Sequence, residues 1–336
     1  MRSATPQTLH ISGYGKKLKK RNNLLVVEWN VDGEKKSLSF TPSTLEHVII
    51  SGEHSVSTGA MRLFFEENVS FSCLDKSGYP LGFLFPHRRC MHVDVWEKQL
   101  MMNEVDALRI AKTICIAAAK NKMSLLRSLQ RSRDIDLEVF IKNVNDVIKN
   151  MHDADDTSSL MGYEGNSSRI YFDAYRKMIP AEFGFENRVR HPSPDPVNVM
   201  LNYGYGILYS KVRMGLIQVN LNPYRGVLHA SYRDQEALVY DLIEEFRQPV
   251  VDKTVLTLIG RKQVSPGSFS IEGEMCMMDD HFKKEFADHI LTRLESKTKY
   301  DDSTESFQVI IDLQARRLRD AIMNCEDYAP FVYRGR

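Results

Sequence analysis

The sequence predicts an α+β protein in which a small N-terminal β-rich domain precedes a larger, mainly α-helical domain. Short apolar runs separated by turn residues dominate residues 1–92, which is typical of strands. From Val93 onward the apolar residues recur at helical spacing instead, beginning with Trp96, Leu100 and Val105. A chain of 336 residues is long enough for two domains that each bury a core. We therefore predict domains over residues 1–92 and 93–336.

Each element of the first domain follows from a local sequence signal. One short helix is predicted from residue 58 to about Asn68, because Ser57 is a good N-cap. Turns are predicted at residues 30–33 and 76–80, which are rich in glycine, proline and polar side chains. Strands are predicted where β-branched and aromatic residues gather between such turns, over residues 24–31, 36–40, 47–50, 69–74 and 81–85.

The second domain is predicted to consist of helices joined by short connections. A long helix is expected to run from the region of Val93 into residues 107–133. The segment 191–196 holds three prolines and is expected to be non-helical. Short strands are expected between Gly260 and Met278. Further helices are expected over residues 137–151, 164–178, 198–219, 279–295 and 305–323.

Composition argues against several classes of protein. A hydrophobic content of 43% and a charged content of 26% are ordinary for a soluble globular protein. No apolar run approaches the roughly eighteen residues of a membrane span, and no signal-like segment opens the chain, so we expect a cytoplasmic protein. The cysteines favour reduced thiols over a disulfide frame or a zinc knuckle, because they are odd in number, scattered and without a CxxC pair. They are Cys73, Cys90, Cys115, Cys276 and Cys325.

Basic residues are concentrated in one predicted helix. Residues 107–133 contain seven lysines and arginines and no acid, although the net charge of the whole chain is only +1. At about 100° per residue, Arg109, Lys120, Arg127 and Arg131 fall on one helical face. Such a stripe suits a DNA phosphate backbone and equally suits a solvated helix face. The absence of acids favours DNA, because solvated faces usually mix both signs.

His229 and the carboxylates of Asp241, Glu244 and Glu245 lie within nineteen residues of the chain. Residues three and four apart share a helical face, so the side chains of Asp241 and either Glu244 or Glu245 can face the same ligand. The histidine upstream, together with a glycine-flanked acid at Glu164, favours a metal site over a merely solvated acidic helix.

Taken singly, each of these residues has an ordinary structural explanation. Glu164 is expected in the first turn of its helix, where a carboxylate is favourable anyway. His229 follows an apolar pair and resembles a buried core histidine, and the acids at 244 and 245 resemble solvent-facing side chains. His54, His87 and His191 have no partners in the sequence. Tyr203, Tyr205 and Tyr209 could stack on bases, but their helical spacing favours core positions.

Several segments together resemble the CRISPR-associated integrase family, the endonuclease of the spacer-acquisition step. They occur in the order of that family and cover roughly residues 50 to 260. One such match would be weak, whereas the ordered set is specific. The segments are 57–63 with 74–82, 162–165 with 171–172, 195–198 with 201–205, 222–229, and 241–247 with 249–252.

The resemblance implies a metal held by Glu164, His229 and Glu244, all of which would be catalytic residues of the helical domain. Asp241 is expected to orient a ligand or to face DNA, with direct ligation as the lesser possibility. Oxygen ligands suit Mg²⁺ or Mn²⁺, one imidazole makes Mn²⁺ well tolerated, and the lack of thiolates argues against structural zinc. Arg247 is expected to pair with Asp241 or Glu244, or to contact a DNA phosphate.

The resemblance also implies a reaction and partners. A DNA 3′-hydroxyl would attack a CRISPR repeat by transesterification, and water would replace it in hydrolysis. The expected partners are double-stranded DNA with single-stranded ends, CRISPR repeat DNA, a second copy joined through the β-rich domain, and a small ferredoxin-like companion protein. Two other functions stay open, namely a DNA-binding scaffold without catalysis and a structure-selective repair nuclease acting on branched DNA.

Overall fold

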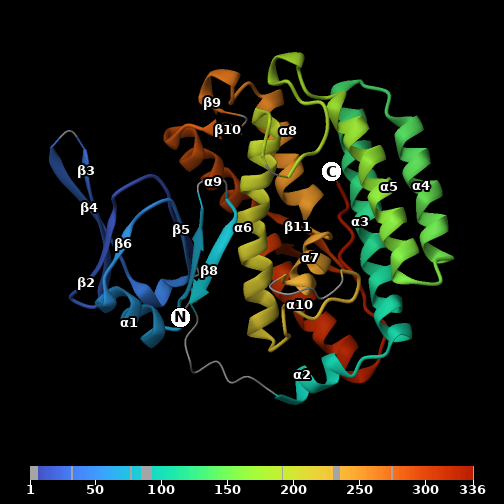
Figure 1. Cartoon of the computed structure of the whole chain (residues 1–336), viewed down its shortest axis with the longest axis horizontal. Coiled ribbons are helices and arrows are strands. Elements are labelled where there is room, and N and C mark those ends of the chain that lie inside the picture. The colour runs from blue at the N-terminus through green and yellow to red at the C-terminus, as the bar shows by residue number, and fades with distance from the viewer. Residues whose placement is uncertain are drawn as a thin grey trace.

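The computed structural model describes residues 7–31, 33–75, 78–84, 93–190, 192–229, 235–273 and 275–335. The predicted fold class is confirmed, since a β-rich N-terminal region precedes a mostly helical one (Figure 1). The predicted boundary at residue 92 and the sequence positions of His87 and His191 lie outside the described residues. None of the described helices is long and apolar enough to cross a membrane.

The N-terminal region forms two four-stranded sheets around one apolar core that includes Leu18, Leu25, Val48 and Phe64. The first sheet has the order β1 (Gln7–Ile11), β5 (Leu45–Ser51), β7 (Ser70–Leu74) and β8 (Pro80–Leu84). The second has the order β4 (Glu34–Phe40), β3 (Leu24–Val31), β2 (Lys17–Arg21) and β6 (Ser55–Val56).

One helix of the N-terminal region, α1 (Thr58–Glu66), follows the predicted N-cap. The Ser57 side chain accepts a hydrogen bond from the Ala60 amide, as the sequence indicates. Strands β1 and β2 were not predicted. In β2 only Leu18 is buried and its neighbours are basic, so the strand lacks the apolar alternation by which strands are recognised.

Nine helices are described in the second region. They are α2 (Val93–Leu100), α3 (Glu104–Arg133), α4 (Glu138–His152), α5 (Thr157–Arg176), α6 (Pro196–Gln218), α7 (Ala237–Ile243), α8 (Lys253–Gly260), α9 (Asp280–Glu295) and α10 (Phe307–Asn324). A π-helical turn over Arg247–Asp252 joins α7 to α8. Two hairpins complete the region, β9 (Phe269–Glu272) with β10 (Met275–Met278), and β11 (Lys297–Tyr300) with β12 (Ser303–Ser306).

Helix α6 begins at Pro196, which was expected to be non-helical, because proline is compatible with the first position of a helix and Asp195 caps it. Two other helix boundaries differ more from the prediction. Helix α5 begins at Thr157 and not at Glu164, because Asp156 caps it by accepting a hydrogen bond from the Ser159 amide. Glu164 therefore lies two turns inside the helix, and the first-turn explanation for it does not hold. The long helix expected from Val93 onward is divided into α2 and α3, with Asn103 as the N-cap of α3. The hairpin β11–β12 was not predicted.

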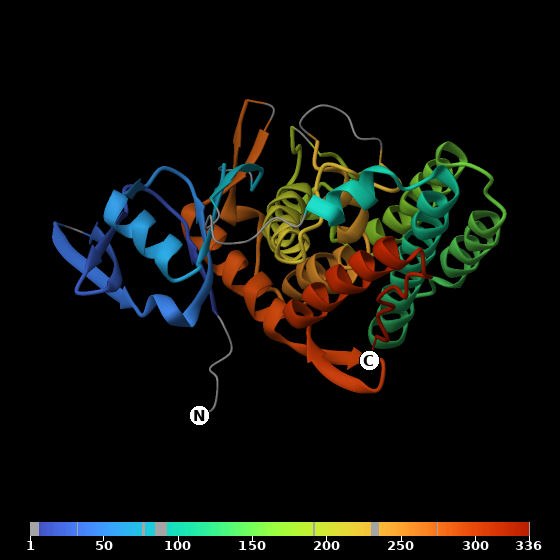
Figure 2. The same ribbon diagram turned by 90° about the horizontal axis from the view of Figure 1, so that it is seen from below.

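Helix α6 is the central element of the fold (Figures 1 and 2). It is buried along almost its whole length and contacts α7, α9 and α10 as well as strands β7 and β8. The N-terminal region docks directly on it, because a Cβ atom on Gly206 would lie 1.7 Å from the carbonyl oxygen of Gly78. The Tyr203 hydroxyl and the Ser51 hydroxyl lie 2.7 Å apart across the same junction.

Candidate active site

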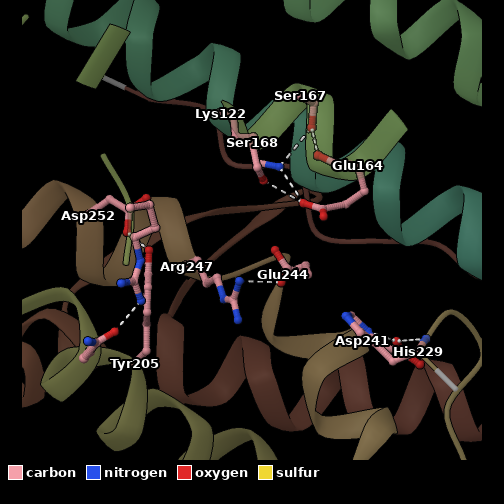
Figure 3. A network of polar contacts seen from close by, with 12 residues as sticks. Lys122, Glu164, Ser167, Ser168, Tyr205, His229, Asp241, Glu244, Arg247 and Asp252 are labelled. Carbon is pink, nitrogen blue, oxygen red and sulfur yellow. Dashed lines mark hydrogen bonds and ion pairs between the residues drawn. The ribbon is translucent and has the colours of Figure 1, made fainter. Parts of the chain in front are cut away.

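The three residues predicted to hold a metal line one cleft of about 390 Å³. Glu164 comes from α5, His229 from the loop before α7, and Glu244 from the residue that follows α7. The side chains that surround them are mainly polar or basic (Figure 3). The other lining residues are Ser168, Arg169, Phe172, Asp173, Asn187, Arg188, Arg190, Tyr205, Arg247 and Gln248.

His229 is held in place by Asp241. The fully buried Asp241 carboxylate lies 2.7 Å from Nδ1 of His229 and accepts hydrogen bonds from the amides of Val227, Leu228 and His229 at 2.6, 3.2 and 3.0 Å. Burial disfavours a charged imidazole, but the hydrogen bond to Asp241 and the negative charges of Asp241 and Glu244 together outweigh it and raise the pKa of His229. With Nδ1 occupied in this way, Nε2 is the ring nitrogen that can ligate a metal. The Asp241 carboxylate therefore fixes the orientation of the His229 ring.

Glu164 forms an ion pair with Lys122, a buried lysine that was not predicted as a site residue. The Lys122 ammonium, only 1% exposed, lies 3.0 Å from Oε1 of Glu164, and the Ser168 hydroxyl donates to the same oxygen at 2.7 Å. Burial alone would raise the pKa of Glu164, but the Lys122 charge and the Ser168 hydrogen bond lower it to about 2. The carboxylate is therefore ionised, as a ligand of a divalent cation must be.

Glu244 pairs with Arg247, one of the three partners expected for this arginine. Nη1 of Arg247 lies 2.7 Å from Oε1 of Glu244. The guanidinium group also lies over the ring of Tyr205, 4.9 Å from its centroid, and Arg188 contacts the same ring at 5.3 Å. The alternative explanation of Glu244 and Glu245 as solvent-facing side chains does not hold, because both are less than 5% exposed.

The tyrosines of α6 do not share one role. Tyr203 and Tyr209 are buried, as predicted for core positions. Tyr205 is an exception, because it lines the cleft, and its hydroxyl donates to the buried carboxylate of Asp252 at 2.5 Å. Tyr171 donates to the other oxygen of Asp252 at 2.8 Å. Tyr205 thus connects the cleft arginines to a buried polar group.

The basic stripe of α3 points away from this cleft. Lys120, Arg127 and Arg131 are exposed and lie roughly 140° to 180° around the helix from Lys122, whose ammonium contacts Glu164. Arg109 is paired with Asp106 and Asp327, so its charge is compensated. DNA contact by the stripe stays a prediction, while the cationic side chains at the cleft itself are Arg188, Arg190 and Arg247, together with Arg169.

The donor set of the cleft fits Mg²⁺ or Mn²⁺ in its chemistry, with two carboxylates and one imidazole. In the described parts of the chain, however, no three His, Cys, Asp or Glu side chains converge closely enough to hold an ion. Lys122 and Arg247 neutralise the two carboxylates instead. Binding of a cation to Glu244 would therefore compete with the ion pair that Glu244 makes with Arg247.

Sequence reasoning missed Lys122, Arg188 and Asp252. Lys122 belongs to the basic stretch, but it lies off the stripe, and its burial depends on how α3 packs against α5. Arg188 lies in an irregular segment where periodicity carries no information. Asp252 lies in a segment quoted for the family resemblance, so its place in the last acidic motif was the available signal.

Substitution Asp241→Asn is expected to destabilise the fold by about 3 kcal/mol, because hydrogen bonds to a buried charge are each worth roughly 1.5 to 3 kcal/mol. The asparagine amide would place its own N–H groups against the loop amides that now donate to Asp241. Urea unfolding measures the difference, with the exposed Asp155→Asn as control. A loss below about 1 kcal/mol would contradict this account of the loop.

Substitution Asp252→Asn is expected to change how stability depends on pH. Burial raises the pKa of Asp252 from 3.8 to about 6, so the folded protein holds this proton more tightly than the unfolded chain. The resulting contribution is fully present below the unfolded pKa and is lost as the pH rises through about 6. It amounts to about 3 kcal/mol. Guanidinium unfolding between pH 3 and pH 8 should show a flatter profile for the variant, and parallel profiles would contradict this assignment.

Comparison with known proteins places the chain in a family. The family model described as CRISPR associated protein Cas1 matches residues 9–291. A protein named CRISPR-associated endonuclease Cas1 1 from Methanospirillum hungatei is 37% identical over 96% of this chain and 98% of its own length. A protein of the same name from Archaeoglobus fulgidus is 31% identical over 96% and 99%.

A solved structure shares the fold. A casposase bound to integration product superposes with a TM-score of 0.87 at 22% identity, covering 98% of this chain and 94% of that one. The fold, the ordered motifs and the sequence relatives agree, and the chain belongs to the CRISPR-associated protein Cas1 family.

Proposed function

We propose that this protein is a metal-dependent DNA endonuclease and integrase that inserts captured foreign DNA fragments into a CRISPR array as new spacers. The observation that carries the proposal is that Glu164, His229 and Glu244 line one cleft together with several arginines. The relatives from Methanospirillum hungatei and Archaeoglobus fulgidus, which are named as endonucleases, support a nuclease.

The residues of the cleft would have different roles in the reaction. Glu164, His229 and Glu244 would hold Mg²⁺ or Mn²⁺, which would neutralise charge on the phosphate under attack and lower the pKa of the attacking hydroxyl. Asp241 keeps Nδ1 of His229 engaged and so fixes the orientation of the ring. Arg188 and Arg247, which both lie against Tyr205, would bind DNA phosphates.

The proposed assembly follows the family resemblance. Its members would be a duplex with single-stranded ends, CRISPR repeat DNA, a second copy of this chain joined through the β-rich region, and a small ferredoxin-like companion protein, all in the cytoplasm. The exposed residues Lys120, Arg127 and Arg131 would contribute to DNA binding away from the cleft.

Strand transfer tests the proposal. A labelled short duplex is offered to a supercoiled plasmid bearing a repeat, with the companion protein and with Mn²⁺, Mg²⁺ or a chelator, and branched DNA is offered in parallel. The expected result is metal-dependent joining that His229→Ala abolishes. Cutting of branched DNA without joining would favour a repair nuclease, and metal-independent binding without either reaction would favour a scaffold.

A further inference from the structure

The C-terminal segment, residues 325–335, runs along the back of the candidate active site. We call it the C-terminal strap. It follows α10 in extended form and ends beside α3, where the amide of Gly335 donates to the Ser124 hydroxyl at 3.0 Å (Figure 2). The strap lies beyond residues 9–291, the part of the chain that the family model matches.

The strap is anchored on Glu245, the acid that follows Glu244 in the chain. The Tyr328 hydroxyl donates to one carboxylate oxygen of Glu245 at 2.7 Å, and the amide of Phe331 donates to the other at 2.7 Å. Gln314 of α10 donates to that second oxygen at 3.0 Å. Glu245 is fully buried and is absent from the lining of the cleft, so it faces the strap while Glu244 faces the site.

A second anchor is Asn121, the residue that precedes Lys122. Its side-chain nitrogen donates to the backbone carbonyls of Glu245 at 2.8 Å and of Phe331 at 3.1 Å. Its side-chain oxygen accepts from the amide of Tyr333 at 2.7 Å. Asn121 therefore ties α3, the strap and the backbone next to Glu244 together at one buried point.

The apolar side chains of the strap make this attachment rigid. Tyr328, Phe331 and Tyr333 are each at most 4% exposed. The ring of Phe331 stacks on that of Phe246, with centroids 5.5 Å apart and planes 9° apart. Apolar burial of this extent holds the strap in the core, and the hydrogen bonds to Glu245 and Asn121 set its register.

We propose that the strap is a positioning element of the active site, which fixes Glu244 and Glu164 relative to each other through their chain neighbours. Glu245 sets the backbone that carries Glu244. Asn121 sets the backbone that carries Lys122, and the Lys122 ammonium contacts Glu164. The two carboxylates come from separate elements, and the strap contacts both of those supports at once. This inference rests on the proposed metal-dependent function of the cleft.

Two substitutions at Glu245 distinguish the effect of its hydrogen bonds from the effect of its side-chain volume. In Glu245→Gln, the amide oxygen accepts from Phe331 and Gln314, and the amide nitrogen donates to the Tyr328 hydroxyl, so all three contacts survive. In Glu245→Leu the acceptors are lost while the volume is similar. The matched control is Glu46→Leu, because Glu46 also accepts from three side chains, those of Lys211, Gln218 and Gln308, and does not line the cleft.

The measurement is Mn²⁺ affinity in the absence of DNA, followed by the paramagnetic resonance signal of free Mn²⁺, together with kcat and KM for DNA cutting. We expect Glu245→Leu to weaken Mn²⁺ binding at least tenfold and to lower kcat more than it changes KM. Glu245→Gln should stay within threefold of the unaltered protein, and Glu46→Leu should bind Mn²⁺ normally. Should Glu245→Leu fail to fold, Tyr328→Phe replaces it, with an expected loss of about fivefold, which exceeds the range allowed for Glu245→Gln.

Other outcomes would contradict either the positioning role of the strap or the proposed metal-dependent function of the cleft. Normal Mn²⁺ affinity and kcat in a folded Glu245→Leu protein, or in Tyr328→Phe, would overturn the positioning role. Equal weakening by Glu46→Leu would also overturn it, because the effect would then follow from general destabilisation. If the unaltered protein binds no Mn²⁺ and cuts no DNA, the proposed function itself fails, and the strap inference falls with it.

Discussion

Replacement of His229 by alanine is expected to abolish metal-dependent cutting and joining of DNA, with a loss of at least about a thousandfold in rate. The substitution removes the only nitrogen ligand of the proposed set. It leaves the Asp241 carboxylate bonded to the amides of Val227, Leu228 and residue 229, so the loop keeps its anchor and the fold survives.

Rates are measured by strand transfer and by cutting of a labelled duplex in Mn²⁺, and folding is checked by circular dichroism and thermal unfolding. The exposed His281→Ala is the control and should retain full activity, because its side chain is 85% exposed and does not line the cleft. Activity within tenfold of the unaltered protein in a folded His229→Ala variant would contradict the assignment of this histidine.

Replacement of Gly226 by alanine is expected to distort the loop that carries His229, because the added Cβ atom would overlap its neighbours. A Cβ atom there would lie 2.6 Å from the carbonyl oxygen of His229, 2.8 Å from Cβ of Ala237 and 2.9 Å from Oδ2 of Asp241. Overpacking of this kind costs about 1 to 3 kcal/mol. Any relief must shift His229 or Asp241, and a displacement of about 1 Å at a reacting group lowers activity about a hundredfold.

Gly267→Ala is the matched control, since its added Cβ would meet only the Ser265 hydroxyl oxygen, at an ordinary 3.5 Å. Unfolding by urea and the rate of DNA cutting are measured for both variants. Unchanged stability and activity in Gly226→Ala would show that the loop adjusts freely and that the position of His229 does not depend on this close contact.

Most of the fold could be predicted from local sequence. The N-cap at Ser57, the proline segment before α6 and the apolar periods of α4, α9 and α10 each depend on residues near in the chain. The start of α5 was predicted seven residues too late. The helix begins at Thr157 and includes Gly162 and Gly165, which both have open space around them.

The residues of the candidate site were named from the sequence, but the contacts between them were not. Residue type and family order identified Glu164, His229, Asp241 and Glu244. The sequence could not say that Lys122 would be buried against Glu164, because that contact joins α3 to α5 across 42 positions of the chain. Residue spacing alone left Glu244 and Glu245 as alternatives, and only the family resemblance selected Glu244.

By itself, the sequence determined the class of fold, most of the helices and the chemical types of the site residues, because these depend on periodicity, capping and the order of short motifs. Only the tertiary structure decided which charges meet. In the structure Lys122 contacts Glu164, whereas the basic stripe of α3 faces away from the cleft. Glu244 lines the cleft, and Glu245 contacts the C-terminal strap. The reason is physical: burial and pairing of a charge depend on packing between elements distant in the chain, which local pattern does not contain.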